Sequence, residues 1–198
     1  LDVLFPEPCI HCGSTQNSPL FLCSKCLLEL PRNLHPIPSP EIIHTLWGMA
    51  EYMGPAGTLI RRCKYKPDHL IFREIVHRME CSSLPWEEFD VITHVPTTFQ
   101  RKFVRGFDQA QILAQLLATS VSIPYMSLLK RHDPKAQSLR TYKQRKEKLS
   151  FRFGCTTTPP KKVLVVDDIC TTGSTLEACA FALLNEGTEH VYGLVVGY

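Results

Sequence analysis

The sequence predicts an α/β fold with a parallel, doubly wound sheet, preceded by a small cysteine-rich module. Aliphatic, strand-type runs at residues 89–98, 161–168 and 190–198 alternate with helix-type segments at 107–120 and 173–187. Strands of this kind, alternating with helices, are typical of a parallel sheet that helices cover. Two Cys-x2-Cys pairs near the start predict the module. The 198 residues suffice for one domain of ordinary size and this appendage.

The remaining elements follow in chain order. Residues 1–30 hold the cysteine pairs and are too few to bury a core of their own. Residues 31–41 carry four prolines and are predicted to form an extended connector to a main domain at 42–198. In that domain, residues 44–54 alternate like a strand, and residues 55–66 and 68–80 indicate two helices that are interrupted near Pro67.

The paired cysteines indicate a structural zinc site. Cys9, Cys12, Cys23 and Cys26 can collect one tetrahedral ion and leave no open position for a substrate, although His11 is a competing ligand. Free or disulfide-linked cysteines are the alternative.

The cysteines also bear on the cellular compartment. An odd total of nine cysteines, and a start at residues 1–8 without signal-peptide features, favour a reducing compartment, so we expect a cytoplasmic protein.

The overall charge and hydropathy of the chain exclude few classes of function. The net charge of +3 is too mild to indicate nucleic-acid binding by itself. No apolar run approaches the roughly 18 residues that a membrane span needs, so we expect no membrane span.

The stretch VLVVDDICTTGST, residues 163–175, places two acids at the end of a buried-type strand. Ligands of parallel sheets lie at this edge, where Asp167 and Asp168 fall. The segment that follows would wrap N–H groups and hydroxyls around an anion at a helix N-terminus, through Cys170, Thr171, Thr172, Gly173, Ser174 and Thr175. A ligand with a phosphate at one end, and with hydroxyls and Mg²⁺ at the other, fits both features. The alternative is a strand end with incidental acids before an ordinary capped helix.

This stretch resembles the phosphoribosyl pyrophosphate motif of the type I phosphoribosyltransferases. The resemblance implies that Asp167 and Asp168 contact the ribose hydroxyls and that residues 170–175 hold the 5-phosphate. It also implies the phosphoribosyltransferase kind of doubly wound sheet.

A second stretch, VPTTFQRKFVRGFDQAQ, resembles a signature of the ComF family of competence proteins, which are phosphoribosyltransferase homologues that also begin with a four-cysteine module. Asp108 stands where that family usually has Asn. The pyrophosphate would meet the turn made by Val95, Pro96, Thr97 and Thr98. Arg101 and Arg105 could offer guanidinium groups to its oxygens, the alternative being a solvated helix face.

Residues 130–148 hold eight Lys or Arg against two acids. By resemblance to related transferases, this segment would be a lid over the pyrophosphate. The same charge could hold a nucleic-acid backbone through Arg140, Lys143 and Arg145, and a solvated loop is the third possibility. Histidines outside these motifs are expected to pack on helix or core faces, namely His44, His69, His77 and His94.

Two functions follow as expectations from the resemblance. The first is a ComF-type protein that binds phosphoribosyl pyrophosphate or a related nucleotide with Mg²⁺ and acts in DNA uptake and natural transformation, with single-stranded DNA and other competence proteins as partners. The alternative is an active phosphoribosyltransferase that moves ribose 5-phosphate to a nitrogen base and releases pyrophosphate. Asp167, Asp168, Arg101 and Arg105 would then be catalytic, and a hood over the acceptor would have to come from residues 1 to about 60.

Overall fold

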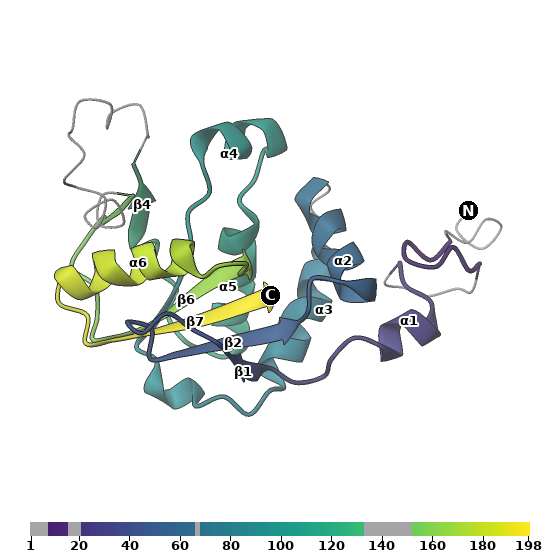
Figure 1. The fold of residues 1–198 in the computed structure, drawn as a ribbon, viewed down its shortest axis with the longest axis horizontal. Coiled ribbons are helices and arrows are strands. Elements are labelled where there is room, and N and C mark those ends of the chain that lie inside the picture. The colour runs from purple at the N-terminus through teal and green to yellow at the C-terminus, as the bar shows by residue number, and fades with distance from the viewer. Residues whose placement is uncertain (1–7, 16–20, 66–67, 133–151) are drawn as a thin grey trace.

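A computed structural model describes residues 8–15, 21–65, 68–132 and 152–198, which form three layers with a sheet in the middle (Figure 1). The helices are α1 (Ser24–Leu28), α2 (Gly54–Tyr65), α3 (His69–Glu80), the 3-10 helix η1 (Trp86–Glu88), α4 (Phe99–Arg105), α5 (Gln109–Ser120) and α6 (Ser174–Asn185). The strands are β1 (His35–Ile37), β2 (Thr45–Ala50), β3 (Val91–His94), β4 (Leu129–Arg131), β5 (Phe153–Cys155), β6 (Lys162–Ile169) and β7 (His190–Gly197).

The main sheet has the strand order β1-β2-β7-β6-β3. Neighbours from β2 to β3 run parallel, and only β1 is antiparallel, at the edge beside β2. The parallel sheet predicted from the aliphatic runs is therefore confirmed. Strand β2 differs from its prediction, because five of its six residues are buried and none of them alternates with an exposed one. Strand β2 lies between β1 and β7, and both of its faces are covered. Because neither face meets solvent, its side chains do not alternate between apolar and polar positions.

Helices cover both faces of the sheet, which confirms the doubly wound arrangement. One core cluster joins α2, α3 and α5 to one face, and a second joins α6 and the β4–β5 hairpin to the other. The carboxyl ends of β3 and β6 remain open between these layers, and the site lies there. In the part of the chain that the structure describes, no helix combines the length and apolar character needed to cross a membrane.

The cysteine module packs against the same face as α2 and α3. Leu22, Cys26 and Leu30 are buried in that core cluster. The guanidinium of Arg62 in α2 lies 5.5 Å from the ring centre of Phe21. Within the proline-rich range 31–41, β1 pairs with β2 and so ties the chain to the main sheet. The module therefore packs on α2, and the segment that follows it is tied to the sheet edge through β1.

Helix α4 is a separate short helix that the sequence pattern did not reveal. It begins after Thr98, whose Oγ1 accepts a hydrogen bond from the backbone N–H of Arg101 at 3.2 Å. It ends at Gly106, where φ is +78°, a conformation that side chains with a Cβ seldom adopt. Asp108 then caps α5 by accepting from Gln111. The caps at Thr98 and Asp108 and the bend at Gly106 separate α4 from α5, and α4 projects from the body of the protein (Figure 1).

Candidate functional site

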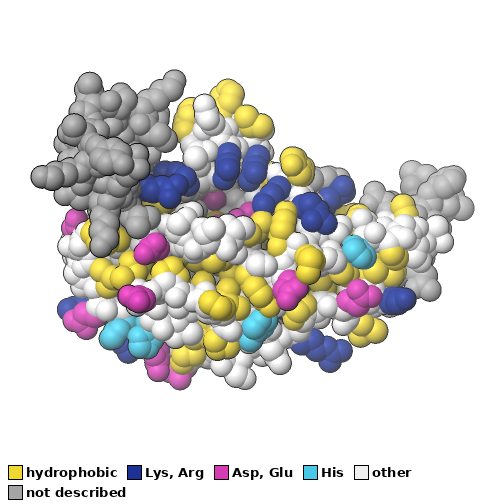
Figure 2. All heavy atoms as spheres, in the orientation of Figure 1, with side chains coloured by type: hydrophobic (Ala, Val, Ile, Leu, Met, Phe, Trp, Pro, Cys, Tyr) yellow, Lys and Arg dark blue, Asp and Glu magenta, His cyan; other side chains and the backbone are white. Residues whose placement is uncertain are grey.

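A cavity of about 530 Å³ opens at the carboxyl ends of β3 and β6. Its lining brings together parts of the chain that are far apart in sequence: Tyr52, Lys64, Val95, Pro96, Thr97, Arg101, Arg105, Phe107, Asp108, Gln109, Ala110, Arg131, Arg152, Asp167, Asp168, Ile169, Thr171 and Thr175. Figure 2 shows Lys and Arg side chains along a hollow below α4, with acidic side chains visible inside it. The two motif regions from the sequence therefore face one cavity.

The acidic pair lies at the end of β6. Oδ1 of Asp167 accepts a hydrogen bond from the backbone N–H of Asp168 at 2.8 Å, and Lys64 lies 3.8 Å from Oδ2 of Asp168. Burial, followed by repulsion from Asp168, raises the pKa of Asp167 well above its usual range. A second positive charge at this pair would relieve that repulsion. The pair therefore favours a cation or hydroxyl donors over an anion.

The loop after the pair wraps an anion-sized hollow of about 70 Å³ that adjoins the main cavity. All six predicted phosphate-binding residues, 170–175, line it, and Thr171 and Thr175 line the main cavity as well. Gly173 turns the chain with φ at +71° and serves as the N-cap of α6 without a side-chain hydrogen bond. The hydroxyls of Thr172 and Ser174 lie 3.0 Å apart. N–H groups at such a helix start are suited to a phosphate.

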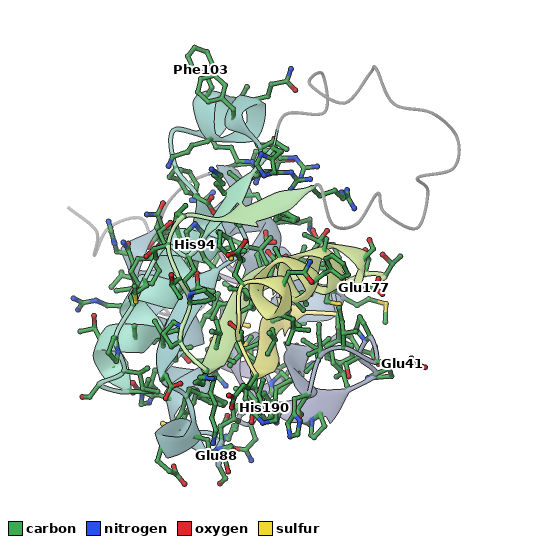
Figure 3. All side chains as sticks on the ribbon, turned by 90° about the vertical axis from the view of Figure 1, so that its left-hand side faces the viewer. Glu41, Glu88, His94, Phe103, Glu177 and His190 are labelled. Atoms are coloured by element: carbon green, nitrogen blue, oxygen red, sulfur yellow. The ribbon has the colours of Figure 1, made fainter. Side chains whose placement is uncertain are left out.

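Asp108 fixes the backbone of the predicted pyrophosphate turn, residues 95–98, through a hydrogen bond. Its Oδ2 accepts a hydrogen bond from the backbone N–H of Thr97 at 2.9 Å and lies 4.0 Å from Nε2 of His94. His94, labelled in Figure 3, is buried, as expected. Its Nδ1 lies 2.9 Å from the hydroxyl of Tyr125. Burial lowers the pKa of His94. Thr98 caps α4 and does not line the cavity, so three of the four turn residues face it.

Four arginines line the main cavity together with the acidic pair. Arg101 and Arg105 both line the cavity, and Arg105 donates to the side-chain oxygen of Gln109 at 3.0 Å. Arg131 and Arg152 join them from the β4–β5 hairpin. Burial lowers the pKa of Arg131, and repulsion from Arg152 and Arg101 lowers it further. Such crowding of positive charge is suited to a polyanion such as pyrophosphate.

Three lining residues lie outside the motifs and the basic segment that the sequence singled out, namely Tyr52, Lys64 and Arg152. Lys64 lies 5.2 Å from the ring centre of Tyr52, so the two form a cation-π contact over the acidic pair. No local pattern marks Lys64, whereas Arg131 lies inside the basic segment whose charge was noticed. The expected lid or DNA-binding residues, Arg140, Lys143 and Arg145, lie outside the described residues.

The four module cysteines form a cluster that fits structural zinc. Their sulfur atoms all lie within 4.8 Å of one another, and Cys12 and Cys23 are 3.6 Å apart. A tetrahedral ion about 2.3 Å from each sulfur separates thiolates by roughly 3.8 Å. Although burial acts to raise it, the backbone N–H groups of Cys12, Cys23 and His11 lower the pKa of Cys9 to about 6, whereas burial and the neighbouring cysteines raise the pKa of Cys26. The ring of His11 contacts Thr58 instead, at 3.0 Å.

Comparison with known proteins finds distant relatives along most of the chain. No family model matches. Competence protein F of Haemophilus influenzae is 27% identical over 92% of this chain and 81% of its own length. DNA utilization protein YhgH of Escherichia coli K12 is 25% identical over 92% of this chain and 86% of its own length. A solved glutamine phosphoribosylpyrophosphate amidotransferase from B. subtilis matches 72% of this chain and 26% of its own, with a TM-score of 0.46 and 18% identity.

The parallel sheet with helices on both faces, the acid pair at a strand end and the glycine-containing loop before α6 define a doubly wound α/β protein with a polar cavity at the carboxyl ends of its strands. Its four-cysteine cluster at the start completes the architecture that the motifs predicted. The resemblance to the ComF family is confirmed, because the chain is a homologue of the competence protein F and YhgH proteins over 92% of its length.

Proposed function

We propose that the cavity binds phosphoribosyl pyrophosphate, or a related phosphoribosyl nucleotide, together with Mg²⁺. The observation that carries this proposal is the order of charges within one cavity. The phosphate-type loop lines a hollow that adjoins the cavity, Asp167 lines both the hollow and the cavity, and Asp168 and four arginines line the cavity itself. This order matches a 5-phosphate, a ribose diol and a pyrophosphate in turn.

Each part of such a ligand has named partners. Residues 170–175 would hold the 5-phosphate through backbone N–H groups and hydroxyls. Asp167 and Asp168 would accept hydrogen bonds from the ribose hydroxyls. The turn at residues 95–97 would meet the pyrophosphate, with Arg101, Arg105 and the two hairpin arginines neutralising its charge.

The carboxylates also fit Mg²⁺, which prefers oxygen ligands and is commonly held by one or two carboxylates together with substrate phosphates. Asp167 and Asp168 would hold the ion as part of the ligand complex. Burial, followed by repulsion from Asp168, raises the pKa of Asp167, and a cation held by both carboxylates would offset these two effects. Bound there, Mg²⁺ would neutralise charge on the pyrophosphate.

Phosphoribosyl pyrophosphate with Mg²⁺ is expected to raise the melting temperature of the full chain. At a free concentration about 100 times Kd the stabilisation is about 2.7 kcal/mol, roughly 5 to 10 °C for a chain of this size. Differential scanning fluorimetry measures the shift. Ribose 5-phosphate and inorganic pyrophosphate serve as part-ligands and should each give a smaller one. An unchanged melting temperature at millimolar ligand would contradict the proposal.

The cellular role that we propose is in DNA uptake and utilisation, since the relatives are named for competence and DNA utilisation. Helix α4 offers a surface for single-stranded DNA beside the cavity. Phe99 and Phe103 stack with ring centres 6.3 Å apart and are 83% and 80% exposed. Phe103 points away from the body of the protein (Figure 3). Exposed rings beside Arg101 and Lys102 combine base stacking with phosphate binding.

Replacing Phe99 and Phe103 together with alanine is expected to weaken binding of an oligo-dT strand by about fivefold or more. One stacked base contributes about 1 to 3 kcal/mol, and these side chains are not packed in the core, so the fold should be unaffected. Fluorescence anisotropy at two salt concentrations measures the affinity. The melting shift with phosphoribosyl pyrophosphate should stay unchanged, because neither ring lines the cavity.

Leu70→Ala is the matched control, because Leu70 is a half-exposed apolar side chain that belongs to α3 and not to α4. If the double variant binds the strand as the parent does, α4 is not the DNA surface. A fall in molecular mass by light scattering in the same variant would instead assign α4 to self-association.

Catalytic transfer remains the second candidate, and the arginine-lined end of the cavity favours it. In that reaction the bond from C1 of ribose to the pyrophosphate oxygen breaks, a nitrogen of the acceptor base forms the new bond to C1, and the base loses its proton. Arg101, Arg105, Arg131 and Arg152 would stabilise the leaving pyrophosphate. Release of pyrophosphate with a panel of free bases measures turnover.

A further inference from the structure

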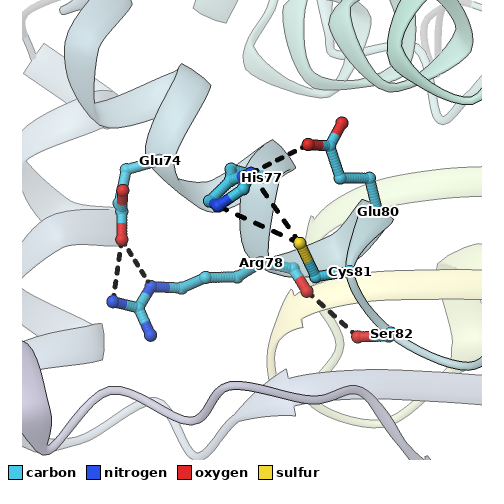
Figure 4. Close-up of polar contacts among 6 residues, drawn as sticks. All are labelled: Glu74, His77, Arg78, Glu80, Cys81 and Ser82. Carbon is cyan, nitrogen blue, oxygen red and sulfur yellow. Dashed lines mark hydrogen bonds and ion pairs between the residues drawn. The ribbon is translucent and has the colours of Figure 1, made fainter.

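We propose that His77, Glu80 and Cys81 form a second metal site that takes a zinc-like divalent ion. They lie at the end of α3, remote in sequence from the Cys9–Cys26 cluster, and none of them lines the main cavity. Their ligand atoms lie within 4.8 Å of one another (Figure 4). The site is independent of the proposed phosphoribosyl function.

The spacing along the helix brings the three donors together. Positions i, i+3 and i+4 share one face of a helix, so the ring, the carboxylate and the thiol project to the same side. Sγ of Cys81 lies 3.8 Å from Nδ1 and 3.9 Å from Nε2 of His77. Nδ1 of His77 lies 2.8 Å from Oε1 of Glu80. A tetrahedral zinc ion bound by all three would separate these atoms by roughly 3.4 to 3.6 Å. The carboxylate must therefore move away from the ring slightly, and the ring must turn so that one nitrogen faces the ion.

The donor set indicates which ions would bind. Imidazole nitrogen and thiolate sulfur are ligands for zinc and similar transition metals, whereas magnesium and calcium take oxygen donors. The carbonyl end of a helix also favours a cation. These properties separate the site from the carboxylate pair in the main cavity, which offers oxygen alone.

The surroundings hold the three residues in place without competing for them. Arg78 is turned to the other side, where it pairs with Glu74 at 2.7 Å and donates to the carbonyl oxygens of Leu30 and Pro31 (Figure 4). Ser82, next to Cys81, donates to the carbonyl of Arg78 and accepts from the backbone N–H of Leu34. The turn that carries Cys81 is thereby fixed against the segment that leaves the cysteine module.

An open position remains for a fourth ligand. His77 and Cys81 are exposed, although His77 was expected to be packed. A groove of about 250 Å³ between α3 and α5 borders His77 and Glu80 and is also lined by Arg73 and Thr119. Water or a small anion from this groove would complete a tetrahedral ion.

Cobalt(II) added to the zinc-loaded full chain tests the site. A thiolate-to-cobalt charge-transfer band is expected in the parent and is expected to be lost in Cys81→Ser and in His77→Gln. After equilibration with zinc instead, elemental analysis should give about two ions per chain in the parent and about one in each variant. Zinc should also protect Cys81 from alkylation, as mapped by mass spectrometry.

His69→Gln and Cys155→Ser are the matched controls. His69 is an exposed histidine at the other end of α3, and Cys155 is a half-buried thiol outside both clusters. Both should keep the band and the second ion. No band at saturating cobalt, or a band that survives unchanged in Cys81→Ser and His77→Gln, would overturn the proposal. Circular dichroism confirms that the exposed substitutions leave the fold intact.

Discussion

Replacing Cys26 with serine is expected to remove about one zinc per chain and to destabilise the fold by several kcal/mol. Cys26 is 3% exposed and lies in the core cluster that includes α2 and α3. Without the ion, the thiols of Cys9 and Cys23 would be left buried with no metal to bind them, and the module has too few apolar residues to fold alone. Elemental analysis and chemical denaturation measure the two effects.

The module also supports the cavity indirectly. It contacts α2 through His11 with Thr58 and through Phe21 with Arg62, and the last turn of α2 carries Lys64 to the acidic pair. We therefore expect Cys26→Ser to weaken ligand stabilisation as well. Cys155→Ser, which keeps a hydroxyl donor for the carbonyl of Ala182, should change neither zinc content nor ligand response. Full stability of Cys26→Ser would show that no structural ion is needed.

Replacing Asp167 with asparagine is expected to stabilise the free protein while abolishing stabilisation by phosphoribosyl pyrophosphate. The amide oxygen can still accept the hydrogen bond from Asp168, and the substitution removes a crowded charge. Relief of the desolvation cost would raise the free energy of unfolding by roughly 1 to 3 kcal/mol at neutral pH. Binding of phosphoribosyl pyrophosphate is weakened because the substitution removes a ligand for Mg²⁺ and an acceptor for the ribose hydroxyls.

This gain in stability should depend on pH with a defined sign. The pKa of Asp167 is raised in the folded state, so the folded protein retains a proton that the unfolded chain releases. Stability from this group is fully present below about pH 4, the usual aspartate range, and is lost as pH rises through the folded value. The difference between Asp167→Asn and the parent should therefore be near zero in acid and grow toward neutral pH.

The matched control is Asp90→Asn. Asp90 accepts a hydrogen bond from the backbone N–H of Lys162 at the opposite end of β6. The Asp90→Asn variant should keep the parent's melting shift with phosphoribosyl pyrophosphate and the parent's dependence of stability on pH. A parent-like melting shift in Asp167→Asn would show that the acidic pair does not hold the ligand.

Much of the fold was predictable because its elements are defined locally. The aliphatic runs of β3, β6 and β7 and the apolar stripes of α3 and α5 record burial directly in the sequence. The cavity edge was also predictable, since parallel strands present their carboxyl ends together. Asp167, Asp168, Arg101 and Arg105 were placed there from the sequence, and all four line the cavity.

Other features needed the packed structure. Helix α4 has seven residues, none of them buried, so no periodic stripe marks it, although Thr98 and Gly106 are cap signals that could have been read. The hairpin of β4 and β5 pairs two three-residue strands across a long intervening segment. Such short strands carry too little pattern to be recognised without their partner.

The sequence by itself determined the strands β3, β6 and β7, the helices α2, α3, α5 and α6, the four-cysteine cluster and the two motifs that face the cavity, because each depends on residues close together in the chain. Only the tertiary structure decided which distant side chains complete the site. Lys64 reaches Asp168 because α2 packs beside β7 on one face of the sheet. Arg131 and Arg152 line the same cavity as Arg101 because the β4–β5 hairpin packs on the other face of the sheet. The grouping of His77, Glu80 and Cys81 depended on the side-chain directions at one helix end.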